Sequence, residues 1–204
     1  MITRGSVMRP LAALVVLLAL VTPAQAATFA VKRGGETRVV FVSKAPTETF
    51  EGRTDRMDGT LVLDPAALGD SLTVRLEVEM AGLSTGSRLR DRHMHERHLE
   101  TAKYPKAVFE GATVLSPAGA SLVPGRTTAL RLAGTFTLHG VSRRLVCDAQ
   151  ATLTRDAAGE RIAFVVTFPV TLADHAISRP EMLFLKLAET QQVRVSAIAS
   201  SSRP

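Results

Sequence analysis

The sequence predicts an all-β protein built as a single barrel or sandwich, and three observations support this. Apolar and polar residues alternate with a period of two along most of the chain, which is typical of strands with one dry and one wet face. Turn-forming pairs such as Asp64-Pro65 and His139-Gly140 separate these runs at short intervals. No internal repeat or low-complexity linker marks a second domain.

The first 26 residues are expected to be a cleaved export signal. Arg4 and Arg9 precede an unbroken apolar run at 11–21, and the small residues Ala24 and Ala26 form an A-x-A site, with cleavage expected after Ala26. A retained membrane anchor is the alternative, although the apolar run is shorter than the roughly 20 residues that a spanning helix needs. We therefore expect a periplasmic or secreted protein whose single domain covers residues 27–204.

Eight strands are expected along that domain. The clearest is 72–80, which alternates without error and places Leu72 and Met80 on the dry face, with Arg75 and Glu77 on the wet face. The eight predicted strands cover residues 38–43, 59–63, 72–80, 107–115, 129–138, 145–153, 161–172 and 192–199.

Two of these strands have unusual faces. Strand 145–153 places Cys147, the only cysteine, on its apolar face, where we interpret it as a small buried hydrophobe. In strand 161–172 the second face is also partly apolar, through Ala163 and Val165. That strand is expected either to meet a covering helix or partner on its outer face, or to be a central strand of the core.

Residues 87–102 interrupt the period of two. Helix-breaking residues are absent between Gly86 and Pro105, so a charged connection with one or two helical turns is expected. It contains His93, His95 and His98, whose spacing would allow a shared zinc or copper ion only if the segment were partly unwound. A solvated basic loop and a loop near an anionic head group are the other two interpretations.

The sequence gives no positive indication of an enzyme. Ser84 and Ser87 lack the G-x-S-x-G context of a nucleophile elbow, and Cys147 lies on an apolar face where a thiolate is unfavourable. Phosphate-binding and dinucleotide-binding glycine patterns are also missing. Lys and Arg number 25 against 19 Asp and Glu, a modest surplus that does not predict a nucleic-acid surface. We expect no catalytic residue, no metal ligand and no cofactor.

Two motifs resemble the signature of the YceI-like family. The first combines LSTG at 83–86 with Arg88, Arg90-Asp91, Leu99, the KYP run at 103–105 and Phe109. The second is LAGTFTLHGV at 132–141, and the resemblance extends over most of residues 50–199. The chain departs from the family pattern at Ser87, at Met94 and at 99–102, where LETA replaces the usual Phe-Asp. These departures put the identity of the ligand in doubt more than the fold.

The resemblance implies a lipocalin-like antiparallel barrel of about eight strands that sequesters or carries a long-chain amphiphile without catalysis. A polyisoprenoid, an isoprenoid quinone and a fatty-acid-like lipid are the expected ligand classes. Arg88, Arg90 and His93 are candidates for a polar mouth around the head group, with a solvated loop as the alternative. Alternation and apolarity give the candidates for the cavity wall as Val108, Phe109, Phe136, Leu138, Phe164, Val166 and Phe168.

Two other functions stay open at this point. One is a metal-binding protein that uses His93, His95 and His98, and the other is a non-catalytic module of a membrane complex, with a solid core in the barrel. The expected partners are the lipid and, transiently, a membrane or membrane protein. The chain is expected to act as a monomer or homodimer.

Overall fold

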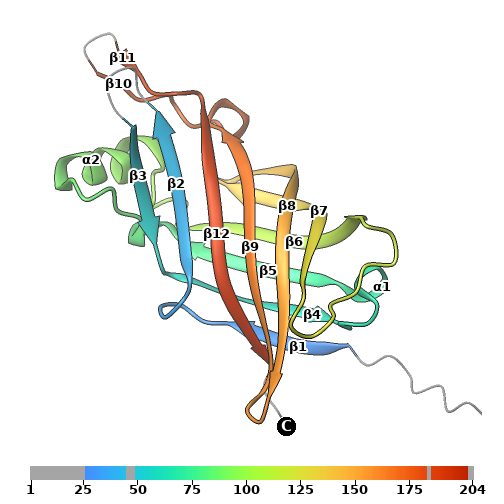
Figure 1. Cartoon of the computed structure of the whole chain (residues 1–204). Helices are drawn as coiled ribbons and strands as arrows, with labels where there is room; N and C mark the ends of the chain where they lie inside the picture. Colours follow the sequence, from blue (N-terminus) through green and yellow to red (C-terminus); the bar gives the residue numbers. More distant parts are fainter. Residues whose placement is uncertain (1–25, 45–48, 183–184, 202–204) are drawn as a thin grey trace, which may run out of the picture.

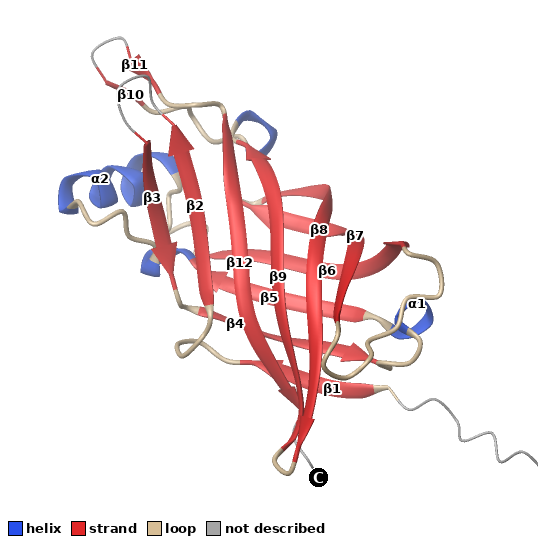
Figure 2. Cartoon of the chain, viewed as in Figure 1, coloured by secondary structure: helices blue, strands red, loops and turns tan. Residues whose placement is uncertain are grey.

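The computed structural model describes residues 26–44, 49–182 and 185–201, and strands make up most of this part of the chain (Figures 1 and 2). The predicted export signal falls almost wholly on residues 1–25, which lie outside the described residues. The elements of the first half are β1 Ala27–Val31, β2 Arg38–Lys44, β3 Thr49–Thr54, β4 Met57–Leu63, α1 Leu68–Ser71, β5 Thr73–Glu79 and η1 Met80–Gly82.

The second half contains longer strands and two short helical connections. Its elements are α2 Arg88–His93, η2 Met94–His98, β6 Lys106–Ser116, β7 Thr127–Leu138, β8 Val141–Asp156, β9 Gly159–Thr171, η3 Ala173–His175, β10 Glu181–Met182, β11 Leu185–Lys186 and β12 Thr190–Ser201. No helix among the described residues is long and apolar enough to cross a membrane.

The strands close into an antiparallel barrel. Hydrogen-bonded neighbours follow the order β1-β4-β5-β6-β7-β8-β9-β12, and β12 pairs again with β1, which completes a ring of eight strands. In Figure 1 the strands β12, β9 and β8 pass in front of β4, β5 and β6. The predicted all-β class and the predicted eight-stranded barrel are both confirmed.

At two places in the ring, two short strands stand where one long strand would be expected: β1 and β2 at one place, and β4 and β3 at the other. β1 and β2 both pair with β12, at Ala199–Ser201 and at Gln192–Ser196 respectively, so they share one edge of that strand. β4 pairs with β1 and β3 pairs with β2, and an isolated bridge joins Arg53 of β3 to Ser84.

All eight strands expected from the alternation are present, and their inner and outer faces follow the expected pattern in β5 and β8. The sequence reasoning missed β1, β3 and the two-residue strands β10 and β11. β1 directly follows the expected cleavage site, and β3 reads TFEGRT, with a single large apolar residue and a glycine. Their pairing with long neighbours, rather than their own composition, makes them strands.

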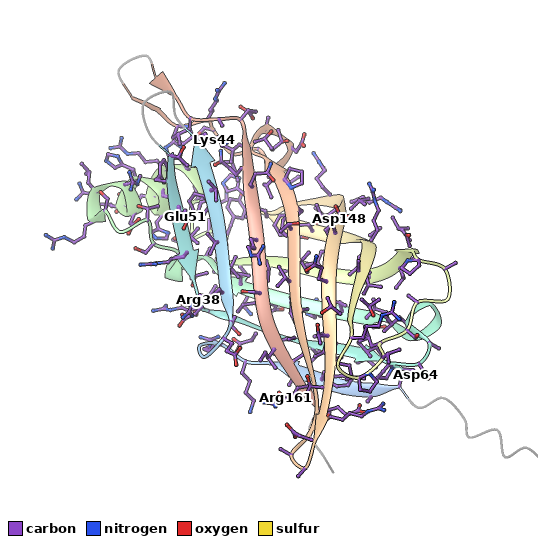
Figure 3. The ribbon with its side chains drawn as sticks, viewed as in Figure 1. Arg38, Lys44, Glu51, Asp64, Asp148 and Arg161 are labelled. Atoms are coloured by element: carbon purple, nitrogen blue, oxygen red, sulfur yellow. The ribbon has the colours of Figure 1, made fainter. Side chains whose placement is uncertain are left out.

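Charged side chains lie on the outside of the barrel (Figure 3), where Glu51, Asp148 and Arg161 are exposed. The outer face of β5 carries a network in which Glu77 contacts Arg75 at 2.7 Å and Lys106 at 2.6 Å. Because charges occupy one face of each strand, the apolar residues of the other face are directed inward.

Candidate binding cavity

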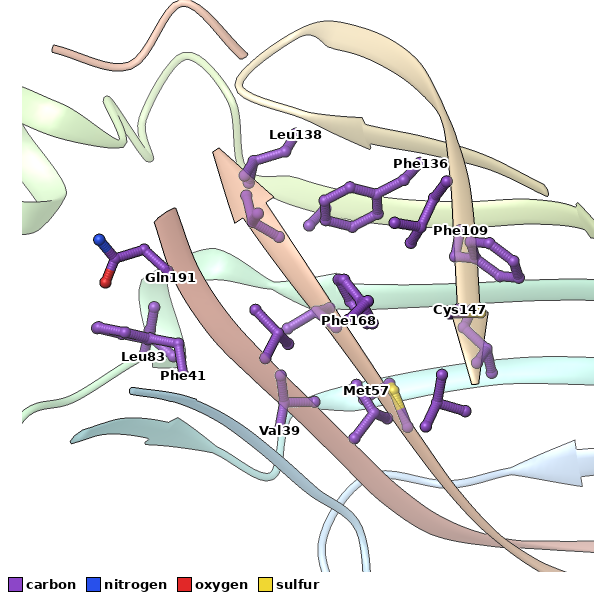
Figure 4. Close-up of a pocket in the computed structure, with 18 of the residues that line it drawn as sticks. Val39, Phe41, Met57, Leu83, Phe109, Phe136, Leu138, Cys147, Phe168 and Gln191 are labelled. Carbon is purple, nitrogen blue, oxygen red and sulfur yellow. The ribbon is translucent and has the colours of Figure 1, made fainter. Parts of the chain in front are cut away.

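The inward faces of the strands surround a cavity of about 790 Å³. This is within the roughly 300–1,000 Å³ typical of small-molecule pockets. Figure 4 shows part of its wall, with Val39, Met57, Phe109, Phe136 and Phe168 around the interior. Alternating residues of β5, β8 and β9 are part of this wall, and the barrel is hollow rather than solid.

The two ends of the cavity differ. At the end next to α1, the lining residues Leu63, Leu68 and Leu122 are at most 5% exposed. Backbone hydrogen bonds from Leu68 to the Ala120 carbonyl (3.0 Å) and from Leu122 to the Pro65 carbonyl (2.7 Å) hold this closure together. At the other end, next to α2, Leu89 is 57% exposed and also lines the cavity. The cavity therefore has a closed apolar end and a mouth at α2.

The cap, which we define as residues 87–104, supplies all the cationic side chains of the cavity lining. Arg90, His93, Arg97 and His98 line the mouth, while the lining includes no Asp or Glu among the described residues. Arg90 is held in place, since its Nε donates to Thr85 Oγ1 at 2.9 Å and its guanidinium lies 4.1 Å above the Phe50 ring. The predicted helical turns are confirmed, as α2 continues into the π-helical turn η2.

A carboxylate fixes the start of the cap. Asp91 accepts hydrogen bonds from the Ser84 hydroxyl (2.7 Å), the Thr85 backbone N–H (2.7 Å) and the Thr85 hydroxyl (2.6 Å). Partial burial of Asp91 alone would raise its pKa, but these hydrogen bonds outweigh burial and hold the pKa below its usual value. The charged form of Asp91 is therefore part of the folded cap.

The end of the cap is fixed by His139. Its Nε2 lies 2.8 Å from Glu100 Oε2 and its Nδ1 lies 3.1 Å from the His175 carbonyl oxygen, while the Tyr104 ring packs 4.3 Å from the imidazole. Both partner atoms are oxygens, so each ring nitrogen of His139 has a polar partner. Positive φ values at His139 (52°) and Gly140 (73°) form the predicted hairpin turn, and the structural interpretation of His139 is confirmed.

The three cap histidines do not form a metal site. Among the described residues no group of three His, Cys, Asp or Glu side chains could hold a metal ion. His95 Nε2 donates to the Leu83 carbonyl at 2.9 Å, whereas His98 Nδ1 contacts Ser178 at 3.1 Å. Partial burial lowers the pKa of His98, with the Ser178 backbone contact acting in the opposite direction. The described structure therefore does not bring the three rings together around one ion, because they face different neighbours.

Most of the residues proposed for the wall do line the cavity, together with Arg90 and His93 of the proposed mouth. Val108 does not, because Ala107 and Phe109 point inward and strict alternation turns Val108 to the opposite face. Arg88 is exposed and lies outside the lining. The wall residues found as proposed are Phe109, Phe136, Leu138, Phe164, Val166 and Phe168.

The outer face of β9 is not covered by any helix of the described part of the chain. Ala163 and Thr167 on that face are exposed, so the expectation of a covering helix there is wrong. Cys147 lines the cavity and is 4% exposed, as predicted for a small buried hydrophobe. Burial raises the pKa of its thiol to about 11, with a smaller contribution from the Asp148 charge.

One polar residue of the cavity lining was missed. Gln191 lines the cavity at 7% exposure, and its Oε1 has no hydrogen-bond partner among the described residues. The only other such buried atom is His95 Nδ1, which does not line the cavity. A glutamine at the start of a strand gives no signal in the sequence, because polar residues are ordinary there.

Comparisons with known proteins give one family and one fold. Residues 30–199 match the YceI-like domain family. No protein with a curated description matches the chain. The structure is similar to that of Burkholderia cenocepacia BcnA, with a TM-score of 0.65, 17% identity, and coverage of 80% of this chain and 96% of that one.

Two further solved structures share the barrel. A polyisoprenoid-binding domain from Saccharophagus degradans matches with a TM-score of 0.63 and 19% identity, covering 87% of this chain and all of that one. The Campylobacter jejuni YceI protein matches with a TM-score of 0.60 and 18% identity, covering 75% and 85%. At these identities the similarity shows the fold alone.

Proposed function

The chain belongs to the YceI-like domain family, and from this premise we propose that it binds a long-chain amphiphile in its barrel without changing it chemically. The ligand would be a polyisoprenoid, an isoprenoid quinone or a fatty-acid-like lipid. The name of the Saccharophagus degradans relative, a polyisoprenoid-binding domain, supports the first of these classes. The protein would sequester or carry this lipid.

The observation that carries the proposal is a long apolar wall that is closed at one end. A chain that enters at α2 would contact Phe136 and Phe168 on its way and reach Leu68 at the closed end. Each buried methylene contributes about 0.8 kcal/mol, so a long tail binds well without directional contacts. The charged side chains of the described lining belong to the cap at the mouth, so none lies along the rest of the path of such a tail.

The cap supports a polar head group at the mouth. Arg90 is already held by Thr85 and Phe50, so it would meet a head group without first losing side-chain freedom. His93 and Arg97 lie beside it in the lining. No reaction is assigned to the cavity, since the Cys147 thiol, with its raised pKa, is a poor nucleophile.

The site of action would be the periplasm or the exterior of the cell. This part of the proposal rests on residues 1–26, whose basic start, apolar run and Ala-Gln-Ala site have the form of an export signal. Cell fractionation with N-terminal sequencing tests it, and a mature chain that starts at Ala27 is the expected result. Full-length protein in the cytoplasm would contradict this part.

The binding proposal is tested by expressing the full chain in bacteria and examining the purified protein by native mass spectrometry before and after organic extraction. The expected result is a co-purifying mass that disappears on extraction and matches an isoprenoid or fatty-acyl lipid. Extracted protein should then take up added geranylgeraniol at a ratio of one to one. A protein that purifies free of lipid and binds none when it is added would refute the proposal.

Two Asp substitutions provide a matched comparison. Phe136→Asp places a charge in the cavity, whereas Val146→Asp places the same charge on the outer face of the neighbouring strand, where Val146 is 37% exposed. Lipid uptake should be lost in the first variant and retained in the second, with similar circular dichroism spectra. Equal uptake by both folded variants would contradict the assigned cavity.

A further inference from the structure

The rim of the cavity mouth carries an exposed apolar side chain. Leu89 of α2 is 57% exposed, more than any other large apolar residue of the described chain, and it also lines the cavity. A single exposed leucine is ordinary on a protein surface. This one stands where the cavity wall reaches the surface, since Met94 and Leu99 of the same cap line the interior. Leu89 therefore joins the outside of the barrel to its apolar inside.

Positive charge surrounds this leucine. The cap contains five basic and three acidic residues, and four of the basic ones are exposed, whereas Glu96 is the only exposed acid among them. The other two acids, Asp91 and Glu100, form the hydrogen bonds that hold the cap to the barrel. The exposed basic residues of the cap are Arg88, Arg92, Arg97 and Lys103.

Neighbouring side chains do not neutralise these arginines. Arg88, Arg92 and Arg97 take part in none of the ion pairs among the described residues. Arg75 on the barrel wall, in contrast, has two acidic partners. Lys44 adds an exposed cation at the end of β2, and Figure 3 shows it at the end of the barrel where α2 lies. The mouth therefore presents positive charge around an apolar centre.

We infer that the mouth of the barrel docks on an anionic phospholipid bilayer, with Leu89 directed into the bilayer and the exposed arginines of the cap at the level of the phosphates. Helices that lie at a membrane surface combine an apolar side, which enters the boundary of the acyl chains, with basic residues that meet anionic head groups. This goes beyond the proposed function, since it says where the barrel collects or delivers its lipid. Docking would let an apolar tail pass between bilayer and cavity without exposure to water.

The first test measures binding of the purified full chain to large unilamellar vesicles by co-sedimentation. Vesicles of phosphatidylcholine with one quarter phosphatidylglycerol should bind the protein on the order of tenfold more tightly than phosphatidylcholine alone, because each basic residue near an anionic surface contributes several-fold. Salt at about 1 M reduces the screening length to about 3 Å and should abolish most of this difference. Equal binding to both vesicles at low salt, or binding to neither, would overturn the inference.

Charge reversal separates the cap from the rest of the surface. The double variant Arg88→Glu/Arg92→Glu should bind the anionic vesicles on the order of tenfold more weakly than wild type. Both residues lie outside the cavity lining, so the affinity for geranylgeraniol in solution should not change. Arg126→Glu/Arg131→Glu makes the same change in net charge at exposed positions away from the cap and should lose much less vesicle binding. Equal loss in the two double variants would overturn the assignment to the cap.

The orientation of docking is tested with a single fluorescent label, in a Cys147→Ala background that removes the native thiol. Leu89→Cys provides a site for the dye NBD at the mouth, and Val123→Cys provides one near the closed end, where Val123 is 51% exposed. Anionic vesicles should shift the NBD emission of Leu89→Cys to the blue and leave that of Val123→Cys unchanged. A shift at Val123→Cys as large as that at Leu89→Cys, or no shift at Leu89→Cys, would overturn the inference.

Failure of docking can be told apart from failure of the proposed function. A protein that takes up geranylgeraniol in solution but binds no vesicles retains the proposed function and loses only the docking surface. A protein that binds vesicles through the cap but takes up no lipid retains the docking surface, and the proposed function fails.

Discussion

At the scale of single residues, the shape of the cavity depends on one close contact between neighbouring strands. Phe109 of β6 lies across Gly134 of β7, and a Cβ atom at Gly134 would come within 2.5 Å of the Phe109 ring. The glycine therefore provides the space in which this ring packs against the sheet. Without that space the ring would have to move into the cavity.

Gly134→Ala should accordingly lower the free energy of unfolding by about 1–3 kcal/mol, as overpacking does, and should reduce lipid uptake. Urea denaturation measures the first effect. Thr135→Ala, an exposed neighbour, serves as the control and should change stability by no more than about 0.5 kcal/mol. Adding Phe109→Leu to Gly134→Ala should recover part of the loss. Stability equal to wild type in Gly134→Ala would contradict this account.

The single cysteine gives a second prediction at this scale. With a pKa raised from 9.0 to about 11, Cys147 has a thiolate fraction at pH 8 that is roughly 100-fold lower than that of an unperturbed thiol. Alkylation by iodoacetamide should be at least that much slower in the folded protein than in urea. Comparable rates in the two states would show that the thiol is not buried in the wall as described.

Single residues also show which parts of the cavity wall could not be predicted from the sequence. Alternation correctly placed Phe136 and Phe164 inside, but it cannot place both Val108 and Phe109 on one face, and only the structure decides between them. The buried position of Gln191 was not found because its side chain bonds to the Ala188 carbonyl, which a loop brings beside it.

At the scale of elements, the cap is held at both ends by polar contacts. Asp91 joins its start to Ser84 and Thr85, and Glu100 joins its end to His139. Between these points, His95 and His98 bond to backbone carbonyls of two different loops. Such contacts orient a short helix that has no buried residue of its own.

The Asp91 contact should make the cap sensitive to acid. Its folded pKa is lower than the unfolded value, so its contribution to stability is present above about pH 4 and is lost as pH falls through the folded pKa. Wild type should exceed Asp91→Ala by about 1 kcal/mol at pH 7, a modest value because the carboxylate is partly solvated. Urea denaturation from pH 7 to pH 2.5 should show this difference shrinking, whereas a constant difference would contradict the assigned role.

The sequence predicted the long elements and missed the short ones for a physical reason. β7, β8 and β9 alternate over 12 or more residues, so their pattern is strong. β1 and β3 are short segments that become strands by pairing with β12 and β2. That tertiary contribution is absent from local composition.

At the scale of the whole molecule, closure of the ring leaves a hollow interior whose filling should stabilise the fold. A ligand that binds only the folded state adds about 2.7 kcal/mol at a concentration of 100 Kd. For a domain of this size we expect geranylgeraniol to raise Tm by roughly 5–10 °C in extracted protein. Calorimetry of wild type and Phe136→Asp tests this, and an unchanged Tm in wild type at saturation would contradict filling of the cavity.

The closed end at α1 has a consequence for which lipids fit. Since Leu63, Leu68 and Leu122 block that end, a tail that entered at α2 would stop there. The distance from Leu68 to Arg90 at the mouth would then set an upper limit on the length of that tail. Longer homologues would have to fold back on themselves or leave part of the chain outside, so the barrel would select its ligand by length.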